Sequence, residues 1–336
     1  MKRLKIAVTM GDPSGIGPEI IVKMFRNHNP QKYADVIVIG DLFPMLSAQR
    51  LIGGNSAIKP LTHIDEKAGC KNTIRLLDLK ALKLKDYVIG EENAASGRAS
   101  YSYLDEAIRL AKAKKIDAIV TAPINKHSLH MAGINEPGHT EILAKKSGTR
   151  DFAMMLMEKR LKVVLVTIHT SIKSVPKLLT RDKIFKKISI THDSLKRDFS
   201  IKKPRIAVLG LNPHAGEAGA FGGEEKQFII PAIKRAVRSG IDASGPYPPD
   251  TIFNRIINGS HDAAVCMYHD QGLIPLKLLG FDTGVNFTMG LPFVRTSPVH
   301  GTAHDIAGTG KASENSIMAA FMAAVEIAQN RKIYKP

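Results

Sequence analysis

The sequence KIAVTMGDPSGIGPEI at residues 5–20 contains the three parts of one structural unit in order. An apolar run at 5–10 predicts a buried strand, a turn rich in glycine and proline follows it, and an apolar-periodic stretch from Pro18 predicts a helix. The same order recurs through most of the chain. Because strands that alternate with helices pack into layers, the sequence predicts an α/β fold.

Further apolar runs predict the other strands. Runs such as IVIG at 37–40 and IAVLG at 206–210 are continuous rather than alternating. Strands buried on both faces have this pattern, which favours a parallel or mixed sheet. The segments 152–157 and 163–168 flank three charged residues and predict an antiparallel hairpin. Strands are expected at 5–10, 36–40, 118–122, 162–169, 205–210 and 262–268, and helices at 18–27, 96–114, 181–199, 223–239 and 313–329.

The composition is that of a globular protein. The chain has 336 residues, 44% of them hydrophobic, and this length favours two α/β domains. The two cysteines, Cys70 and Cys266, are too few for a disulfide framework. No apolar stretch reaches the roughly 18–20 residues of a membrane helix. We therefore expect a cytoplasmic protein. The net charge of +17 comes from scattered basic residues without interleaved aromatics. That pattern favours a small anionic substrate over nucleic acid.

The turn GDPSG at residues 11–15 lies where a strand gives way to a helix. Free N–H groups and the helix dipole attract anions at such a place, so Gly11 and Asp12 are candidate cofactor-binding residues. A tight turn without a ligand explains the glycines equally well. The dinucleotide fingerprint is incomplete, because Ile20 stands where a third glycine is needed. The segment GTGK at 308–311 is no Walker loop, because Ala312 replaces the Ser or Thr.

Three histidines each follow a predicted strand. His169 ends the strand at 163–168, His214 comes after the strand at 206–210, and His269 ends the strand at 263–268. Any one of them alone is more often a surface or core residue than a ligand. In open α/β sheets, however, ligands bind outside the carboxyl ends of strands. Three imidazoles at that edge can hold one transition metal and leave a position for substrate, so we predict a metal site there.

Other polar residues are candidates for binding an anionic substrate and for moving a proton. The anion-binding candidates are His139, Thr140, Lys277, Asn286 and Arg295. Arginine offers a bidentate fork for carboxylate or phosphate, and lysine offers a point charge. Asp250 and Asp270 are candidate catalytic proton acceptors, or side chains that orient a metal-binding histidine. A solvated surface position or a loop cap is the alternative for each residue taken singly.

Six long motifs resemble one known family. They are MGDPSGIGPEI (10–20), TAPINKHSL (121–129), PGHTEIL (137–143), LNPHAGEAGAFGGEE (211–225), YHDQGLIPLK (268–277) and GVNFTMGLPFVRTSPVHGTAHDIAGTGKA (284–312). In this order, and over about residues 4–330, they resemble the 4-hydroxythreonine-4-phosphate dehydrogenase family.

The resemblance implies a fold, an assembly and a set of site residues. The fold would have two α/β/α three-layer domains with a central cleft, of the isopropylmalate-dehydrogenase type. Residues 1–130 and 300–336 would form the first domain, and residues 131–299 the second, with the metal histidines and the dimer interface. The family is homodimeric, with the active site at the subunit interface. Its metal ligands match His169, His214 and His269, and its substrate-binding residues match the five anion-binding candidates.

The resemblance also implies a reaction. Family members use NAD or NADP with one divalent metal, for which three imidazoles favour zinc over cobalt, manganese or magnesium. The hypothesis is oxidation of 4-phosphooxy-L-threonine at its C3 hydroxyl to 2-amino-3-oxo-4-phosphooxybutanoate. Decarboxylation to 3-amino-2-oxopropyl phosphate would follow, in pyridoxal phosphate biosynthesis. The metal would lower the pKa of the hydroxyl and stabilise the enolate, and Asp250 or Asp270 would remove the proton.

Two other functions remain open from the sequence. Relatives of the family oxidise four-carbon sugar-acid phosphates, erythronate or threonate 4-phosphate, which lack the amino group. A zinc hydrolase or a phosphate acyltransferase on a related fold would act without a nicotinamide. The absorbance of the reduced cofactor separates that second class from the dehydrogenases. We expect no nucleic-acid or membrane partner.

Overall fold

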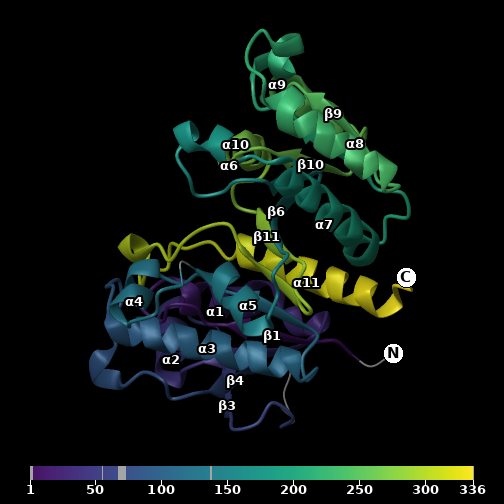
Figure 1. Ribbon diagram of the computed structural model, residues 1–336. Helices are drawn as coiled ribbons and strands as arrows, with labels where there is room; N and C mark the ends of the chain where they lie inside the picture. Colours follow the sequence, from purple (N-terminus) through teal and green to yellow (C-terminus); the bar gives the residue numbers. More distant parts are fainter. Residues whose placement is uncertain (1–2, 55, 67–72, 137, 336) are drawn as a thin grey trace. The chain divides into compact units, whose positions relative to one another are not determined.

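The computed structural model describes residues 3–54, 56–66, 73–136 and 138–335, so that Cys70 and Pro137 lie outside the described residues. The chain divides into two compact units (Figure 1). Unit 1 comprises Met1–Arg150 and Leu291–Gln329, and unit 2 comprises Asp151–Gly290 and Asn330–Pro336.

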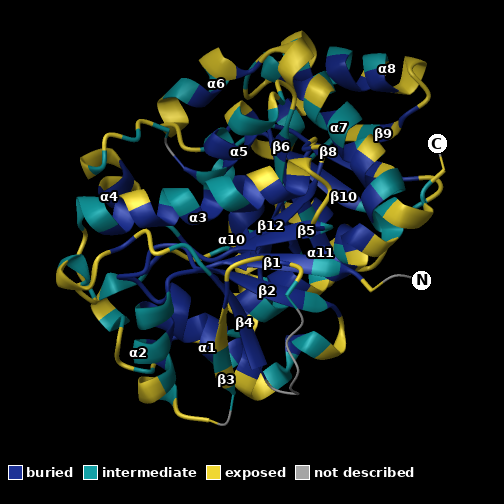
Figure 2. Cartoon of the chain, turned by 90° about the horizontal axis from the view of Figure 1, so that it is seen from below, coloured by how far each residue is buried: buried dark blue, intermediate teal, exposed yellow. Residues whose placement is uncertain are grey.

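Unit 1 is built on a parallel sheet with the strand order β3-β4-β2-β1-β5-β12. Its strands are β1 (Lys5–Thr9), β2 (Asp35–Gly40), β3 (Ala57–Leu61), β4 (Thr73–Asp78), β5 (Ala118–Thr121) and β12 (Val294–Pro298). In β1, Ile6, Ala7 and Val8 all have exposed fractions of 0%, although successive side chains point to opposite faces. Both faces of this strand are therefore covered, and the central strands of the sheet are dark blue in Figure 2, whereas β3 at its edge is largely exposed.

Helices follow the strands of unit 1. They are α1 (Gly17–His28), α2 (Leu42–Ile52), α3 (Ala94–Lys112), α4 (Lys126–Met131), α5 (His139–Ser147) and α11 (Asn315–Ile333), with the short 3₁₀ turns η1 (Pro30–Lys32), η2 (Leu84–Asp86) and η6 (His304–Ile306). Helix α3 begins where Asn93 Oδ1 accepts the Ser96 N–H at 2.8 Å, which satisfies a backbone donor at the helix start. A Cβ on Gly97 would lie 2.0 Å from Ser128 O, so only glycine lets α3 and α4 approach this closely.

Unit 2 is built on a mixed sheet with the order β11-β6-β7-β10-β8-β9. Its strands are β6 (Ala153–Glu158), β7 (Leu161–Leu165), β8 (Arg205–Leu209), β9 (Asp242–Tyr247), β10 (Ala263–Cys266) and β11 (Val285–Met289). The pairs β11–β6 and β6–β7 are antiparallel, and β7, β10, β8 and β9 run parallel to one another. The hairpin predicted at 152–168 is confirmed as β6–β7.

The helices of unit 2 pack on this sheet. They are α6 (Val175–Leu178), α7 (Arg181–Phe199), α8 (Ile230–Arg238), α9 (Pro249–Ile257) and α10 (His269–Leu279), with the 3₁₀ segments η3 (Ile172–Ser174) and η4 (Pro213–Gly219) and the π-helical turn η5 (Glu225–Ile229). Thr180 Oγ1 accepts the Lys183 N–H at 3.2 Å and caps α7, whose bounds are those predicted from the sequence. Among the described residues, no helix has the length and apolar character of a membrane span.

The division between the units differs from the one expected at residues 130 and 300. Helix α5 packs on α3, and β12 pairs in parallel with β5, so both elements belong to unit 1. At the C-terminus, Asn330 Nδ2 donates to Asp198 O at 2.8 Å, and Arg331 Nε donates to the Asp198 carboxylate at 2.6 Å. These two bonds are made inside unit 2, to which residues 330–336 belong.

Candidate metal and substrate site

The three histidines lie beyond the carboxyl ends of three neighbouring strands. His169 follows β7, His269 begins α10 after β10, and His214 lies in η4 after β8. The sheet order places β10 between β7 and β8, and all three run parallel. Their carboxyl ends therefore share one edge of the sheet, which is where open α/β sheets bind ligands.

Hydrogen bonds join these three strand ends. The Thr167 N–H and Oγ1 donate to Met267 O at 3.2 and 2.7 Å, which ties the end of β7 to the end of β10. Gln271 is buried, and its Oε1 accepts the Met267 N–H at 2.7 Å while its Nε2 donates to Gly210 O at 2.7 Å. One side-chain amide therefore fixes the end of β10 to the end of β8. Sequence reasoning missed Gln271, although it directly follows His269 and Asp270 in the motif.

Within one chain, the rings of His169 and His269 lie near each other, and the ring of His214 lies near Phe221. The ring centroids of His169 and His269 lie 5.8 Å apart, whereas the ring of His214 lies 6.2 Å from that of Phe221. Among the described residues, no three His, Cys, Asp or Glu side chains form a group that could hold a metal. The three-histidine metal site stays a prediction.

Asp270 contacts the histidine that precedes it. His269 Nδ1 lies 2.7 Å from Asp270 Oδ1, and both side chains are partly exposed. With the proton on Nδ1, the imidazole donates to the carboxylate and keeps the lone pair of Nε2 for a metal. Asp270 is therefore placed to orient His269. Asp250 lies exposed in the first turn of α9, which packs against the η4 segment that contains His214.

The backbone that carries His214 is strained. Residues His214–Ala218 all have positive φ, between 39 and 81°, and only Gly216 among them is a glycine. A left-handed conformation costs an L-residue about 1–2 kcal/mol. The buried Glu225 holds the start of this turn, because its carboxylate accepts the N–H groups of Leu211 and Asn212 at 2.8 Å each. Strain of this kind clusters at functional sites.

Two of the predicted anion-binding residues, the half-buried His139 and the buried Arg295, lie close to each other in unit 1. His139 is the first residue of α5, and Arg295 on β12 is 1% exposed and donates to Thr121 Oγ1 at 2.6 Å. Burial, followed by the charge of Arg295, holds the pKa of His139 well below its usual value, so this imidazole is neutral. Burial lowers the pKa of Arg295 to about 9, against the opposing effect of Glu141. A buried guanidinium beside a helix N-terminus attracts an anion strongly.

The remaining predicted substrate residues divide between the units. Thr140 is buried in the first turn of α5, beside His139 in unit 1. Asn286 on β11 and Lys277 on α10 belong to unit 2, where Lys277 Nζ lies 5.6 Å from the ring centre of Phe281. His139 Nε2 and Asn286 Oδ1 are buried atoms without a hydrogen-bond partner in the described part of the chain. Buried polar atoms are normally paired, so both atoms are suited to a ligand.

Most backbone N–H groups of the turn at residues 11–15 are paired inside the fold. The N–H groups of Asp12, Gly15 and Ile16 donate to backbone carbonyls, and that of Ser14 donates to Asp12 Oδ1. These donors are thus already used inside the fold. The glycines have a packing reason, because a Cβ on Gly11 would lie 2.2 Å from Pro123 O. Asp12 is buried within this turn, and the assignment of Gly11 and Asp12 as cofactor-binding residues stays a prediction.

Comparisons with known proteins identify similar sequences and folds. Residues 32–324 match the family described as "Pyridoxal phosphate biosynthetic protein PdxA". A protein of Geobacter metallireducens named "4-hydroxythreonine-4-phosphate dehydrogenase" is 45% identical over 97% of this chain and 96% of its own length. A protein of Oceanobacillus iheyensis named "Putative D-threonate 4-phosphate dehydrogenase" is 44% identical over 98% of this chain and 99% of its own. The crystal structure of a 4-hydroxythreonine-4-phosphate dehydrogenase from Klebsiella pneumoniae is similar with a TM-score of 0.90 at 42% identity, over 98% of this chain and 99% of that one.

Proposed function

The chain belongs to the family of the pyridoxal phosphate biosynthetic protein PdxA, and on this basis we propose that it oxidises 4-phosphooxy-L-threonine at the C3 hydroxyl. It is an enzyme of the dehydrogenase class, as its relatives of similar length are. The proposed first product is 2-amino-3-oxo-4-phosphooxybutanoate, a β-keto acid that loses CO₂ to give 3-amino-2-oxopropyl phosphate. The proposed compartment is the cytoplasm, whose reducing conditions suit the free, buried thiol of Cys266.

The largely buried side chains of His139, Thr140 and Arg295 in unit 1 support this substrate most directly. The substrate carries a phosphate and a carboxylate, and Arg295 offers a buried positive charge that attracts either group. His139 is neutral and has a ring nitrogen that finds no partner within the described residues, so it can hydrogen-bond an oxygen of the anion without adding charge. Thr140 beside it offers a hydroxyl and the free N–H groups of the helix start.

The chemistry of the strand-end histidines fits a divalent metal. His169, His214 and His269 would hold it, with zinc favoured by three imidazole ligands. When bound, the metal would supply Lewis-acid polarisation of substrate oxygens. Asp270 orients His269 through the 2.7 Å contact at Nδ1, and Gln271 keeps the ends of β10 and β8 together.

The proton of the C3 hydroxyl needs an acceptor. Oδ1 of Asp270 already lies within hydrogen-bond distance of His269, so of the two carboxylates named from the sequence we propose Asp250 as the base. It is exposed on α9, next to the η4 segment. NAD or NADP, when bound, would accept the hydride from C3.

We further propose that the active enzyme is a homodimer. Helix α10 begins with His269, and large apolar side chains are exposed on it and in the turn after it: Ile274 is 59%, Leu278 83% and, beyond the helix, Phe281 72% exposed. Exposed apolar patches of this kind mark interfaces. A second copy that covers α10 would approach the strand-end histidines and complete the metal site. We expect Leu278→Asp to give monomers by analytical ultracentrifugation and to lower the metal content, and a fully active monomer would contradict the proposal.

One experiment tests the reaction. The purified protein is given a divalent metal, NAD or NADP, and 4-phosphooxy-L-threonine, and reduced nicotinamide and CO₂ are measured together. We expect both signals, and we expect His214→Ala to lose metal and turnover together. No reduced cofactor with any phosphorylated substrate would refute a dehydrogenase, and a His214→Ala variant with full metal content would refute the ligand set.

A second substrate is favoured by one specific observation. The relative from Oceanobacillus iheyensis is nearly as similar as the one from Geobacter metallireducens, and its name refers to D-threonate 4-phosphate. The two substrates share the phosphate and carboxylate and differ in the amino group. Parallel measurements of kcat/KM with both compounds decide between them.

A further inference from the structure

The buried hydroxyl of Thr121 contacts the arginine that we assign to the substrate. Thr121 is the last residue of β5 and has an exposed fraction of 0%, and Arg295 lies on the neighbouring strand β12. Arg295 Nη2 donates to Thr121 Oγ1 at 2.6 Å. A hydrogen bond from a charged donor is stronger than one between neutral groups. The reaction proposed above gives this hydroxyl no part, so its bond to Arg295 needs an explanation.

The register of the two strands shows how the bond arises. Strands β12 and β5 are parallel, and Arg295 pairs with Ile119. Successive side chains of a strand alternate between the faces of the sheet, so Thr121, two residues after Ile119, shares the face of Arg295. Thr121 lies nearer to the carboxyl end of β5 than Ile119 does. Its hydroxyl therefore holds the guanidinium toward the edge at which parallel sheets bind ligands.

The first turn of α5 lies within electrostatic range of this guanidinium. The charge of Arg295 contributes to the lowered pKa of His139, and the charge of Glu141 acts to raise the pKa of Arg295. Thr140 between these two residues of α5 is buried. The N–H groups at a helix start have no acceptor within the helix. Directed toward this turn, Arg295 adds a positive charge to a set of N–H donors that attract an anion.

The orientation of a guanidinium decides what it can bind. Its N–H donors lie in one rigid plane, and they match a phosphate or carboxylate only when that plane faces the anion. The bond from Nη2 to Thr121 uses one donor at the edge of the plane and so restricts its rotation. A group that orients a ligand-binding side chain improves binding without touching the ligand.

We propose that Thr121 is a positioning residue of the substrate site, and that its hydroxyl fixes the orientation of the Arg295 guanidinium. Thr121 acts through Arg295 and does not itself contact the substrate. The inference rests on the proposed function, because it takes Arg295 as the residue that binds the phosphate or the carboxylate of the substrate.

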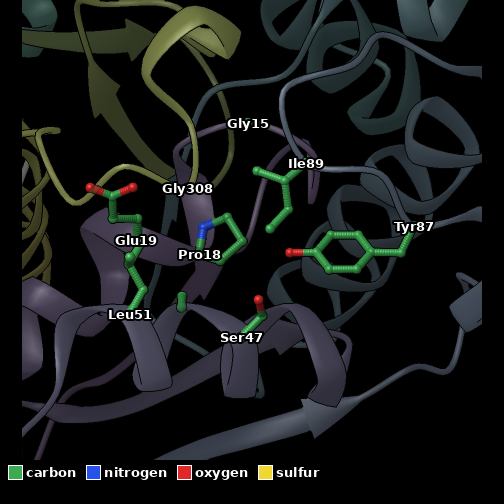
Figure 3. A pocket seen from close by; sticks show the side chains of 9 residues that line it. Gly15, Pro18, Glu19, Ser47, Leu51, Tyr87, Ile89 and Gly308 are labelled. Carbon is green, nitrogen blue, oxygen red and sulfur yellow. The ribbon is translucent and has the colours of Figure 1, made fainter.

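The cavity of unit 1 shown in Figure 3 is a different place. It has a volume of about 140 Å³ and lies between α1, α2 and residues 87–89. Its lining includes the hydroxyls of Ser47 and Tyr87 and the carboxylate of Glu19, but neither Thr121 nor Arg295. A carboxylate in the lining disfavours an anion. Binding of a phosphate to unit 1 therefore reports on Arg295 rather than on this cavity.

Three variants of the full chain test the role of the hydroxyl. Thr121→Val keeps the size of the side chain and replaces the acceptor by a methyl group. Thr121→Ala removes the same hydroxyl and places no atom against the guanidinium, so a folding defect of the valine variant does not prevent the test. Thr121→Ser keeps the hydroxyl and loses only a methyl group.

Thr296→Val is the matched control. Thr296 is buried and directly follows Arg295 on β12, so its side chain points to the other face of the sheet. Its Oγ1 donates to Ala320 O at 2.7 Å. The change removes one buried threonine hydrogen bond from the same sheet and does not touch the guanidinium. We expect it to lower the melting temperature and to leave the affinity for substrate unchanged.

Isothermal titration calorimetry measures binding of 4-phosphooxy-L-threonine and of inorganic phosphate, without nicotinamide so that no turnover occurs. We expect Thr121→Val and Thr121→Ala to weaken binding of 4-phosphooxy-L-threonine about tenfold, and Thr121→Ser to bind within about threefold of the wild type. A matching loss for inorganic phosphate assigns Arg295 to the phosphate group. A loss for 4-phosphooxy-L-threonine alone assigns Arg295 to the carboxylate.

Steady-state kinetics gives a second readout. Hydride transfer changes neither the phosphate nor the carboxylate, so the loss should appear as a higher KM with kcat little changed. Wild-type affinity in both Thr121→Val and Thr121→Ala would overturn the proposal. Equal losses in these variants and in Thr296→Val would overturn it as well, because a general loosening of the sheet would explain both. A wild type that neither binds nor oxidises 4-phosphooxy-L-threonine refutes the proposed function, whereas normal binding by the Thr121 variants of an active enzyme refutes the positioning role alone.

Discussion

Replacing Gln271 by leucine should loosen the edge of the sheet that carries the metal histidines. Its side chain is 6% exposed, and its amide pairs the Met267 N–H and Gly210 O at 2.7 Å each. Leucine fills a similar space but leaves both buried backbone groups unpaired. Each unpaired group costs about 1–3 kcal/mol, so the expected loss in the free energy of unfolding is about 2–6 kcal/mol.

The same change should reach the metal. His269 follows Met267 at the end of β10, and His214 follows Gly210 at the end of β8. Side chains that position metal ligands without touching the metal typically contribute about 10–100-fold to affinity, and we expect a loss of that size. Urea denaturation followed by circular dichroism measures the first effect, and calorimetric zinc titration measures the second.

Two further variants sharpen this test. Gln271→Glu keeps an acceptor for the Met267 N–H and turns a second oxygen toward Gly210 O, so it should also destabilise the protein. Gln31→Leu removes one half-buried amide, whose Nε2 donates to Thr73 O at 2.6 Å in unit 1. It should cost about 1 kcal/mol and leave zinc affinity unchanged. The reasoning is refuted if Gln271→Leu unfolds at the urea concentration of the wild type and binds zinc as tightly.

Three other changes have expected outcomes. Ala218→Gly should stabilise the protein by roughly 0.5–1 kcal/mol in urea unfolding, because relief of the left-handed backbone exceeds the added entropy of the unfolded chain. The control Ala220→Gly, at a residue with φ −66°, should destabilise the protein. Changes of the same sign in both variants would contradict backbone strain at Ala218. Asp270→Asn should weaken zinc binding about 10–100-fold in calorimetry, and unchanged affinity would exclude its role at His269. Burial and the Arg295 charge hold the pKa of His139 well below 6.5, so below that pH the unfolded chain gains a proton that the folded chain does not. The free energy of unfolding should fall by up to about 1.4 kcal/mol per pH unit on acidification below about pH 6.5, and His139→Gln should remove that part of the pH dependence. Urea unfolding of both proteins at pH 7 and pH 5.5 measures it. If the wild type and His139→Gln lose the same free energy between these two pH values, another group is responsible.

Local patterns predicted many of the elements but not all of them or all of their ends, and the strands β3, β4, β9, β11 and β12 were not expected from the sequence. The apolar run at 262–268 predicted a strand to residue 268, whereas β10 ends at Cys266 and α10 begins at His269. Met267 is fully buried yet lies outside the ladder, so its apolar side chain continued the pattern beyond the strand. Strand β3 was missed because its residues are largely exposed and include a proline. The expected boundary at residue 130 placed α5 in the second domain, whereas α5 packs on α3 and is grouped with unit 1, through a contact distant in sequence.

The turn at residues 11–15 shows the limit of motif spacing. The sequence left an anion cradle and a plain turn open, since both need glycines after a strand. The structure shows where the N–H groups donate, and they donate inside the fold. Only the partners of the backbone N–H groups bear on the choice between an anion cradle and a plain turn, because the spacing of the glycines is the same in both.

The sequence by itself determined the alternation of strands and helices, and it determined that each of three histidines follows a strand. These properties depend on residues close together in the chain, where periodicity and turn residues act directly. The tertiary structure alone decided that β7, β10 and β8 are neighbours, that Gln271 joins two of their ends, and that residues 214–218 take a left-handed turn held by Glu225. Strand order and buried hydrogen bonds arise from contacts between residues far apart in the chain, and no local pattern in the sequence records them.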